Sequence, residues 1–408
     1  MAFLAQLWRA GLPAGRPWRA AAVLAVLACS VPLAAWLGVR LLPLAWAGWL
    51  FFNDSTAQWS FARFAMERPA AGLYDGTTLH AFQQALFPPL RQTFPFPYPP
   101  HYLFAVWPLG WLDPRWVWPA WTGGTLLLFL LAGCAGGRWR DAPLLALAPA
   151  AVVAAGYGQN GFLTGALILG GLRLLGRHPG WAGALLAAAT IKPHLGLLIP
   201  LALLAGGQWR ALAGGAAGVL GLVALSSLAF GWEAWPRFLA TILGHAGAID
   251  PWVGDLRKAT IAANLTLAGL PRALAYQVQW ALAAALAVLV ALAFRHQARA
   301  GGITPWGIAL LLAAGFAATP YGFLYDLPVL VAAVLMLART EAGAARRLSW
   351  PEVAVLGAAL LFPVAAVMTS RFYWMTGASL LALVALAAWR VFTPTPADRG
   401  SGGRRESG

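Results

Sequence analysis

Charged residues are scarce in this sequence. Asp, Glu, Lys and Arg together make up 10% of its 408 residues, whereas apolar residues make up 60%. A soluble globular chain carries about 25% charged residues, so this composition excludes one. Apolar runs recur along nearly the whole length, and roughly 20 apolar residues suffice to cross a bilayer as a helix. The sequence therefore predicts an all-α polytopic membrane protein with a single membrane domain.

Cysteine is also nearly absent. Cys29 and Cys134 both lie in apolar runs, which predicts small buried residues and not a disulfide framework. The six histidines are scattered, and no pair of carboxylates has helical spacing. Since this gives no metal-binding spacing, we expect no metal site and no bound cofactor.

The net charge of +15 does not indicate a nucleic-acid partner, because the arginines form short clusters between apolar runs, as loop residues of a bilayer protein do. Residues 98–112 begin and end at prolines and are predicted to be a re-entrant or partial span. The predicted full spans, about twelve, are residues 20–38, 116–136, 142–157, 161–176, 180–191, 195–206, 211–230, 273–294, 304–319, 326–338, 350–370 and 374–391.

The distribution of basic residues predicts the orientation, since cytoplasmic loops are enriched in Lys and Arg. With a cytoplasmic N-terminus, the short outer loops hold only Lys192 and Arg371. The short inner loops hold Arg138, Arg140, Arg173, Arg177, Arg210, Arg295, Arg299, Arg339, Arg346 and Arg347. We therefore expect a multi-pass protein of the inner (plasma) membrane. Its predicted parts are a cytoplasmic N-terminus (1–19), an uncleaved first span within a transmembrane domain (20–392), and a disordered cytoplasmic tail (393–408).

Polar residues of the outer face are concentrated in two loops, about 52–97 and 231–271. Both are rich in Trp, Phe and Pro, which suits the headgroup region of a membrane. Within the first loop, the apolar side chains of residues 56–66 fall near one side of a helix. This pattern predicts an interfacial helix lying in the membrane plane, with a simple covering loop as the alternative.

Asp54 is the acid that best suits catalysis. It lies just past an apolar run, in Phe51-Phe52-Asn53-Asp54-Ser55, at the predicted outer edge of the membrane. Partial desolvation there would raise the pKa of its carboxyl toward that of a working general base. The alternative is that Asp54 caps the helix that follows, because Asp is a favoured N-cap residue.

A second candidate group is the outer turn Gly156-Tyr157-Gly158-Gln159-Asn160-Gly161. The amides of Gln159 and Asn160 can hold sugar hydroxyls, although glycines and amides also form tight turns without any ligand. A third is Ile191-Lys192-Pro193-His194. The chain has only two lysines, Lys192 and Lys258, against 26 arginines, and both lysines map to the outer side.

Lys192 is predicted at membrane depth, where a buried cation needs a partner. A lipid phosphate would be such a partner; the alternative is a lysine that snorkels to the interface. Each remaining outer residue is, taken singly, more often structural than functional. These residues are His245, Asp250, Asp255, Arg257 and Lys258 in the second outer loop, and Tyr321, Tyr325 and Asp326 in the turn TPYGFLYDLP.

Taken in order, several short motifs resemble glycosyltransferase family 87 of the C-type membrane glycosyltransferases over about residues 15–392. They are FNDSTAQWSFARFA (52–65), Leu73-Tyr74-Asp75, Phe96-Pro97-Tyr98-Pro99-Pro100, Gly158-Gln159-Asn160-Gly161, Lys192-Pro193-His194 and Tyr325-Asp326. No single motif is specific, but the ordered set is more so. The resemblance implies a C-type glycosyltransferase (GT-C) fold. It also implies use of a polyprenyl-phosphate sugar donor, as in the actinobacterial mannosyltransferases of the family.

In this family the acid of the first outer loop is the proposed catalytic base, a role that falls on Asp54. The implied reaction moves a sugar, mannose in the actinobacterial members, to a lipid or glycan acceptor, and one base without a covalent nucleophile gives inversion. Basic side chains would stabilise the leaving phosphate without a metal. The implied substrate-binding residues are Asp75, Tyr98, Gln159, Asn160, Lys192, His194, His245, Arg257, Lys258, Tyr325 and Asp326.

Two other classes of protein remain open on the sequence. A lipid or solute transporter would line a path across the membrane and often contains repeats, and no internal repeat is present here. A non-catalytic envelope assembly protein would need no carboxylate at the membrane edge. A polymerase or ligase of lipid-linked glycans is a closer enzymatic alternative. The expected partners in the enzyme interpretation are the lipid-linked donor, the acceptor and membrane lipids, with no nucleic acid.

Overall fold

The computed structural model describes residues 16–41, 53–88, 90, 93–135, 139–247, 258–343, 348–368 and 374–393. Throughout these ranges the regular structure is helical, apart from one isolated antiparallel bridge between Lys258 and Phe323. The predicted all-α class is thus confirmed. The N-terminal residues before Arg16 and the tail after Thr393 lie outside the described residues.

Four helices of the described ranges are long and apolar enough to cross a membrane unaided. They are α6 (Pro114–Cys134), α12 (Trp209–Phe230), α15 (Arg272–Arg299) and α19 (Trp374–Phe392). The other predicted spans also coincide with helices. These are α2 (Arg16–Leu41), α9 (Gly161–Leu174), α10 (Pro179–Ala188), α11 (Ile199–Ala205), α16 (Pro305–Ala318), α17 (Pro328–Gly343) and α18 (Trp350–Met368). The predicted span 142–157 is two helices, α7 (Ala142–Leu147) and α8 (Pro149–Tyr157), because Pro149 starts a new helix after extended Ala148.

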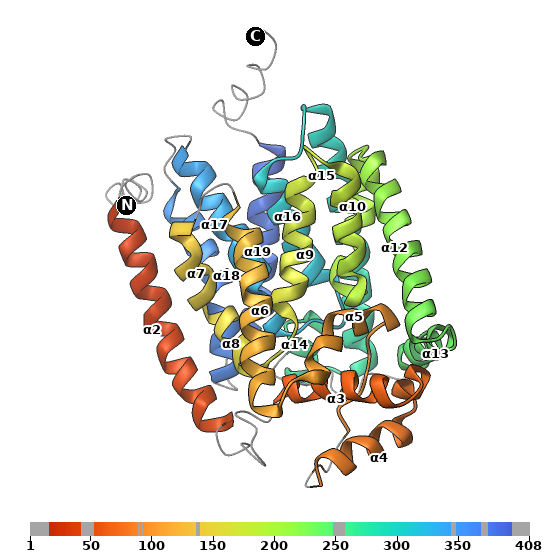
Figure 1. Cartoon of the computed structure of the whole chain (residues 1–408). Helices are drawn as coiled ribbons and strands as arrows, with labels where there is room; N and C mark the ends of the chain where they lie inside the picture. The colour runs from red at the N-terminus through yellow and green to blue at the C-terminus, as the bar shows by residue number, and fades with distance from the viewer. Residues whose placement is uncertain are drawn as a thin grey trace, which may run out of the picture.

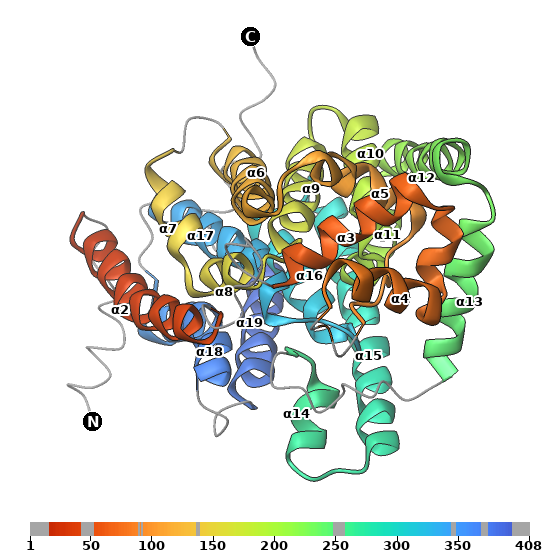
Figure 2. The ribbon, with the colours of Figure 1, turned by 60° about the horizontal axis from the view of Figure 1, so that its bottom comes forward.

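The helices form a bundle in which most axes run between two ends (Figure 1). Helix α2 starts and α19 ends at the upper end, as expected if both termini lie on one side. The helix α3 (Asp54–Glu67) crosses the lower end, where α4 (Gly76–Leu86), α13 (Ala234–Gly247) and α14 (Ile261–Leu267) also lie. When this end is turned forward, the helices of the two predicted outer loops lie over it (Figure 2).

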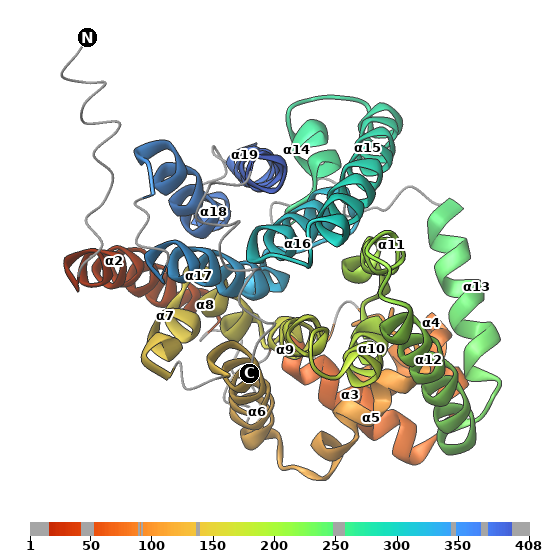
Figure 3. The ribbon, with the colours of Figure 1, turned by 90° about the horizontal axis from the view of Figure 1, so that it is seen from above.

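Helix α16 lies at the centre of the bundle, beside α15, α17 and α19 (Figure 3). It has 14 residues, and nearly all of them are buried. Two glutamines of α15 satisfy backbone groups at or next to its ends. Gln279 donates to the carbonyls of Ala317 and Ala318, at 2.8 and 3.0 Å, and Gln297 accepts from the Thr304 N–H at 2.7 Å. A short helix is tolerated at membrane depth because neighbouring protein satisfies its ends in this way.

Basic residues hold the upper end together. Arg173 at the end of α9 donates to the carbonyl of Gly133 at the end of α6, at 3.0 Å. Arg339 of α17 pairs with Asp141, and Arg390 of α19 pairs with Glu352 of α18 in a buried salt bridge. These arginines, which include two of the predicted inner-loop set, therefore gather at the end opposite α3.

The first predicted outer loop packs as a small aromatic core around α3. This core includes Phe61 and Phe64 of the loop together with Tyr98 and Tyr102 of the following segment, all buried. Nine of the 14 residues of α3 are buried, so the helix exists as predicted but is covered by protein on more than its apolar side. Residues 98–112 form only short helices, η3 (Pro100–Tyr102), α5 (Leu103–Val106) and η4 (Trp107–Trp111), which agrees with a partial span.

Candidate active site

Asp54 is the first residue of α3, but it does not cap this helix. The cap is Asn53, whose Oδ1 accepts from the Ser55 N–H at 3.0 Å. The Asn53 Nδ2 also donates to the Gly156 carbonyl at 3.0 Å, which ties the start of α3 to α8. The capping alternative for Asp54 is therefore wrong. As an acid in the first turn, the Asp54 carboxylate is instead stabilised by the positive end of the helix dipole.

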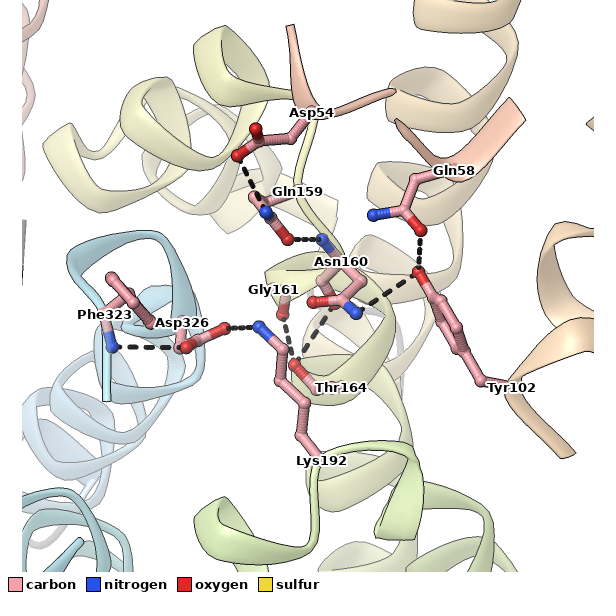
Figure 4. Close-up of polar contacts among 10 residues, drawn as sticks. All are labelled: Asp54, Gln58, Tyr102, Gln159, Asn160, Gly161, Thr164, Lys192, Phe323 and Asp326. Carbon is pink, nitrogen blue, oxygen red and sulfur yellow. Dashed lines mark hydrogen bonds and ion pairs between the residues drawn. The ribbon is translucent and has the colours of Figure 1, made fainter. Parts of the chain in front are cut away.

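The amide of Gln159 holds the Asp54 carboxylate. Its Nε2 donates to Asp54 Oδ2 at 2.7 Å (Figure 4), across 105 positions of sequence. Gln159 is in the turn between α8 and α9, after Gly158. Gly158 has φ +65°, and a Cβ there would come within 2.7 Å of Asn53 Oδ1. The glycine is thus required for the turn to lie against the start of α3, and the turn does more than reverse the chain.

Gly161 brings the same turn against a second segment. A Cβ at this position would lie 1.8 Å from the carbonyl oxygen of Tyr325, so only glycine allows this approach. Tyr325 belongs to η8 (Leu324–Asp326), which precedes α17. The predicted Gly-Gln-Asn-Gly and Tyr-Asp motifs are therefore in direct contact.

Lys192 has a carboxylate partner inside the protein. Its Nζ lies 2.6 Å from Asp326 Oδ1, and both side chains are nearly fully buried. The other oxygen of Asp326 accepts from the Phe323 N–H at 3.3 Å, and Lys192 Nζ also lies 4.9 Å from the centre of the Tyr325 ring. The alternative in which Lys192 snorkels to the membrane surface is wrong, because the ammonium points into the protein (Figure 4).

The second lysine meets the same segment from the other side. Lys258 forms the bridge with Phe323, and its Nζ lies 4.8 Å from the Tyr321 ring centre and 5.6 Å from that of Phe323. Burial, and to a smaller extent the charge of Arg272, lower the pKa of Lys258 to about 7. Both lysines of the chain thus converge on residues 321–326, with the stacked rings of Phe323 and Tyr325 between them.

Tyr98 is under the influence of both carboxylates. Its buried ring lies against that of Tyr102, with centroids 4.1 Å apart, and the charges of Asp326 and Asp54 act on its hydroxyl. The side chains of Tyr98 and Gln58 also form a hydrogen bond. Tyr98 therefore lies near both Asp54 and Asp326, and its role in substrate binding stays a prediction.

Other predicted residues are placed differently. Asp75 caps α4, accepting from the Thr77 hydroxyl at 2.6 Å and the Thr78 N–H at 2.7 Å; these bonds lower its pKa to about 2. His194 packs edge-on against Tyr321, with Nε2 buried and without a hydrogen-bond partner. His245 is a residue of α13, but its side chain, like Asp250, Asp255 and Arg257, lies outside the described residues.

Three polar residues of the site were not singled out from the sequence: Asn53, Gln58 and Tyr102. Gln58 is one turn after Asp54 on α3, and Tyr102 donates to its Oε1 at 2.7 Å. The sequence carried a signal for Gln58 alone, because a polar residue four positions after an acid on the same helix shares its face. Within the described residues, no group of three or more His, Cys, Asp or Glu side chains could hold a metal ion. Metal independence itself stays a prediction.

A carboxylate held by an amide, a buried Lys–Asp ion pair and neighbouring tyrosines form one polar cluster at one end of a helical, membrane-type bundle. This arrangement suits acid–base chemistry on a substrate at the membrane edge. The sequence model of glycosyltransferase family 87 matches residues 96–320, more than half of the chain. The protein therefore belongs to glycosyltransferase family 87. No curated protein and no solved structure matches it.

Family membership makes the protein a glycosyltransferase, with a sugar donor and an acceptor as substrates. It favours the enzyme over the transporter and the non-catalytic assembly protein. The matched range contains Tyr98, Gln159, Asn160, Lys192 and Lys258, whereas Asp54, Tyr325 and Asp326 lie outside it. The structure links the two sets through the Gln159–Asp54 and Lys192–Asp326 contacts.

Proposed function

We propose that this glycosyltransferase moves a sugar, most suitably mannose, from a polyprenyl-phosphate donor to a lipid or glycan acceptor at the outer face of the membrane, with inversion. Asp54 is the general base. The observation that carries the proposal is the 2.7 Å hydrogen bond from Gln159 to Asp54, which fixes a carboxylate at the edge of the bundle. A carboxylate has about four lone-pair positions, so it can accept an acceptor hydroxyl in addition to the amide.

The reaction is a single displacement. Asp54 takes the proton of the acceptor hydroxyl, and that oxygen attacks the anomeric carbon of the donor sugar. The bond from this carbon to the phosphate oxygen breaks, and its electron pair leaves with the lipid phosphate. Attack from the face opposite the leaving group inverts the anomeric centre, as in single-displacement glycosidases.

The leaving phosphate gains negative charge and needs nearby cations or hydrogen-bond donors. In this proposal Lys258 faces the phosphate, together with Lys192, whose charge is shared with Asp326. Arg257 and His245 are further candidates from the second outer loop. A phosphate monoester leaving group held by basic side chains requires no divalent metal, so we propose that the reaction is metal-independent.

The test is a transfer assay with purified protein in proteoliposomes, polyprenyl-phosphate mannose and candidate lipid or glycan acceptors. Wild-type protein should transfer mannose with unchanged rate in EDTA, and nuclear magnetic resonance should show the inverted anomer. The variant Asp54→Asn keeps size and fold but loses the base, so its rate should fall by about 10²–10⁴. Near-normal transfer by Asp54→Asn would end its assignment as the base.

A matched control separates loss of the base from loss of any outer carboxylate. Asp113 caps α6 and pairs with Arg115 on the surface, so Asp113→Asn makes the same chemical change at a second helix start. Asn is as good an N-cap as Asp, so this variant should fold and transfer normally. An equal loss in both variants would point to a general effect of charge.

A further inference from the structure

Three buried side chains beside Asp54 form a hydrogen-bonded chain that the transfer mechanism does not use. The Tyr102 hydroxyl donates to Gln58 Oε1 at 2.7 Å, and Asn160 Nδ2 donates to the Tyr102 oxygen at 3.3 Å (Figure 4). The three residues are each no more than 1% exposed. They come from three separate elements: α3, η3 and the turn before α9.

The single hydroxyl proton of Tyr102 determines the direction of this chain. Because Tyr102 gives its proton to Gln58, its oxygen accepts from Asn160, and both carboxamides are oriented by it. The Gln58 Oε1 then faces the tyrosine, and its Nε2 points away from it, toward the Asp54 side of the view (Figure 4). Gln58 is four residues after Asp54, so the two side chains share one face of α3.

Asn160 has a polar atom that the protein leaves unsatisfied. With its Nδ2 on Tyr102, its Oδ1 is buried and has no hydrogen-bond partner. A buried acceptor without a donor is destabilising, so such atoms are rare outside functional sites. A carboxamide nitrogen carries two N–H donors, and one of those of Gln58 is used in its hydrogen bond with Tyr98. The chain therefore ends in the second N–H of Gln58 and an unmet acceptor on Asn160, on either side of the Tyr102 hydroxyl.

We propose that Gln58 and Asn160 form a subsite for a hydroxyl group of a sugar ring, next to Asp54, and that Tyr102 is the positioning residue that orients both amides. A hydroxyl donates one hydrogen bond and accepts others, so it suits a donor–acceptor pair better than a phosphate does. The inference rests on the proposed sugar transfer. The hydroxyl belongs either to the donor sugar or to a sugar of the acceptor.

The test compares Tyr102→Phe and Gln58→Met with wild type. Tyr102→Phe removes one oxygen and lets both amides turn, whereas Gln58→Met keeps the length of the side chain but removes the donor. A contact made equally in the ground state and the transition state affects KM and leaves kcat nearly constant. We expect KM to rise by about three- to tenfold for one substrate only. That substrate, donor or acceptor, is the one whose hydroxyl occupies the subsite.

Sugar analogues that lack one hydroxyl identify the group. In wild type, one deoxy analogue of the affected substrate should show the same rise in KM. In Tyr102→Phe and Gln58→Met, that analogue and the normal substrate should have equal KM, because the contact is already lost. Tyr276→Phe, which removes the equivalent oxygen from a half-buried tyrosine of α15, is the matched control and should keep wild-type constants.

Each outcome decides the matter. Unchanged KM for both substrates in both variants, with or without a lower melting temperature, would mean that the chain only ties α3, η3 and α9 together. If Tyr102→Phe does not fold, Gln58→Met alone carries the same comparison. If the wild type transfers sugar and both variants keep wild-type KM for donor and acceptor, the subsite is wrong and the proposed function stands. A wild type that transfers no sugar overturns the proposed function and the subsite with it.

Discussion

At the scale of single residues, Lys192 and Asp326 form a pair whose two members depend on each other. Both are buried, at 6% and 0% side-chain exposure, and 134 positions separate them. Removing one partner from such a pair leaves an uncompensated charge and destabilises a protein by about 3–5 kcal/mol. The pair therefore connects the residue before η7 (Pro193–Gly196) to η8, and this structural role is independent of any contact between Lys192 and a substrate.

We predict that Lys192→Ala lowers the melting temperature strongly, and that Lys192→Ala combined with Asp326→Asn recovers most of the loss. Donor use should stay impaired in the double variant, because the phosphate still lacks a cation. Lys192→Arg should restore transfer only in part, since a planar guanidinium replaces a point charge. Thermal unfolding and donor KM are the measurements. Full transfer by the double variant would show that Lys192 serves only to neutralise Asp326.

As the pH rises, Lys258 is expected to increase the stability of the protein and to decrease its activity. Its pKa is lowered to about 7, mainly by burial, below the ordinary value of 10.5. Between about pH 7 and pH 10 the unfolded chain therefore holds a proton that the folded chain does not, and stability rises with pH. Phosphate binding needs the charged lysine, so kcat/KM should fall as the pH rises through about 7.

The measurements are melting temperature and kcat/KM from pH 6 to pH 9. In Lys258→Arg the side chain stays charged over this range, so the alkaline fall in kcat/KM should vanish. The ammonium lies over the ring faces of Tyr321 and Phe323, and Arg272 adds positive charge. An identical alkaline fall in Lys258→Arg would assign it to another group.

At the scale of elements, the site depends on close contact between the α8–α9 turn and η8. The absence of a side chain at Gly161 lets the Tyr325 carbonyl approach it. Since Asp54 is held by this turn and Lys192 by η8, a shift of either element changes the distance between the base and the cations. The same turn contacts Asn53 through Gly158, so α3, α8, α9 and η8 are positioned together.

We predict that Gly161→Ala impairs transfer at least as strongly as it impairs folding. A Cβ 1.8 Å from a carbonyl oxygen forces backbone to move, and the Tyr325 backbone cannot rotate away as a flexible side chain would. The matched control is Gly123→Ala on α6, where an added Cβ meets nothing within 4 Å. Melting temperature and kcat, compared between the two variants, decide this; normal transfer by Gly161→Ala would contradict the close approach.

At the scale of the whole molecule, the candidate site and the arginine contacts lie at opposite ends of the bundle. The arginine contacts of α6, α9, α17 and α19 lie at the end opposite α3 and the candidate site (Figure 1). Cytoplasmic loops are enriched in basic residues, so this separation places the site at the outer face if the chain follows the common rule.

We predict that a cysteine replacing exposed Thr77 on α4 reacts with an impermeant maleimide added outside the cell. A cysteine replacing exposed His178, in the turn between α9 and α10, should react only after the membrane is opened. Both are made with Cys29 and Cys134 replaced by alanine, so that no other thiol is labelled. The reverse labelling pattern would invert the topology and place the site in the cytoplasm.

The sequence by itself determined the positions of the apolar helices, but not those of α4, α13 and α14 in the two outer loops. Whether a segment crosses lipid depends on its own hydropathy, a local property, and so each predicted span coincides with helix. Pro149 was the exception, since a proline inside an apolar run breaks a helix that hydropathy alone would continue. The ordered motifs also indicated the family, and the match of the family's sequence model to residues 96–320 confirms it.

Only the tertiary structure decided which polar groups meet. From the sequence, Asp54 could be a cap, Lys192 could snorkel, and Asn53 and Tyr102 had no pattern that singled them out. In the folded protein Asn53 is the N-cap of α3, and Lys192 pairs with Asp326. Gln159 donates to Asp54, 105 positions away in the sequence. A hydrogen bond acts over about 3 Å. Which distant residues come that close depends on how the helices pack, here through Gly158 and Gly161.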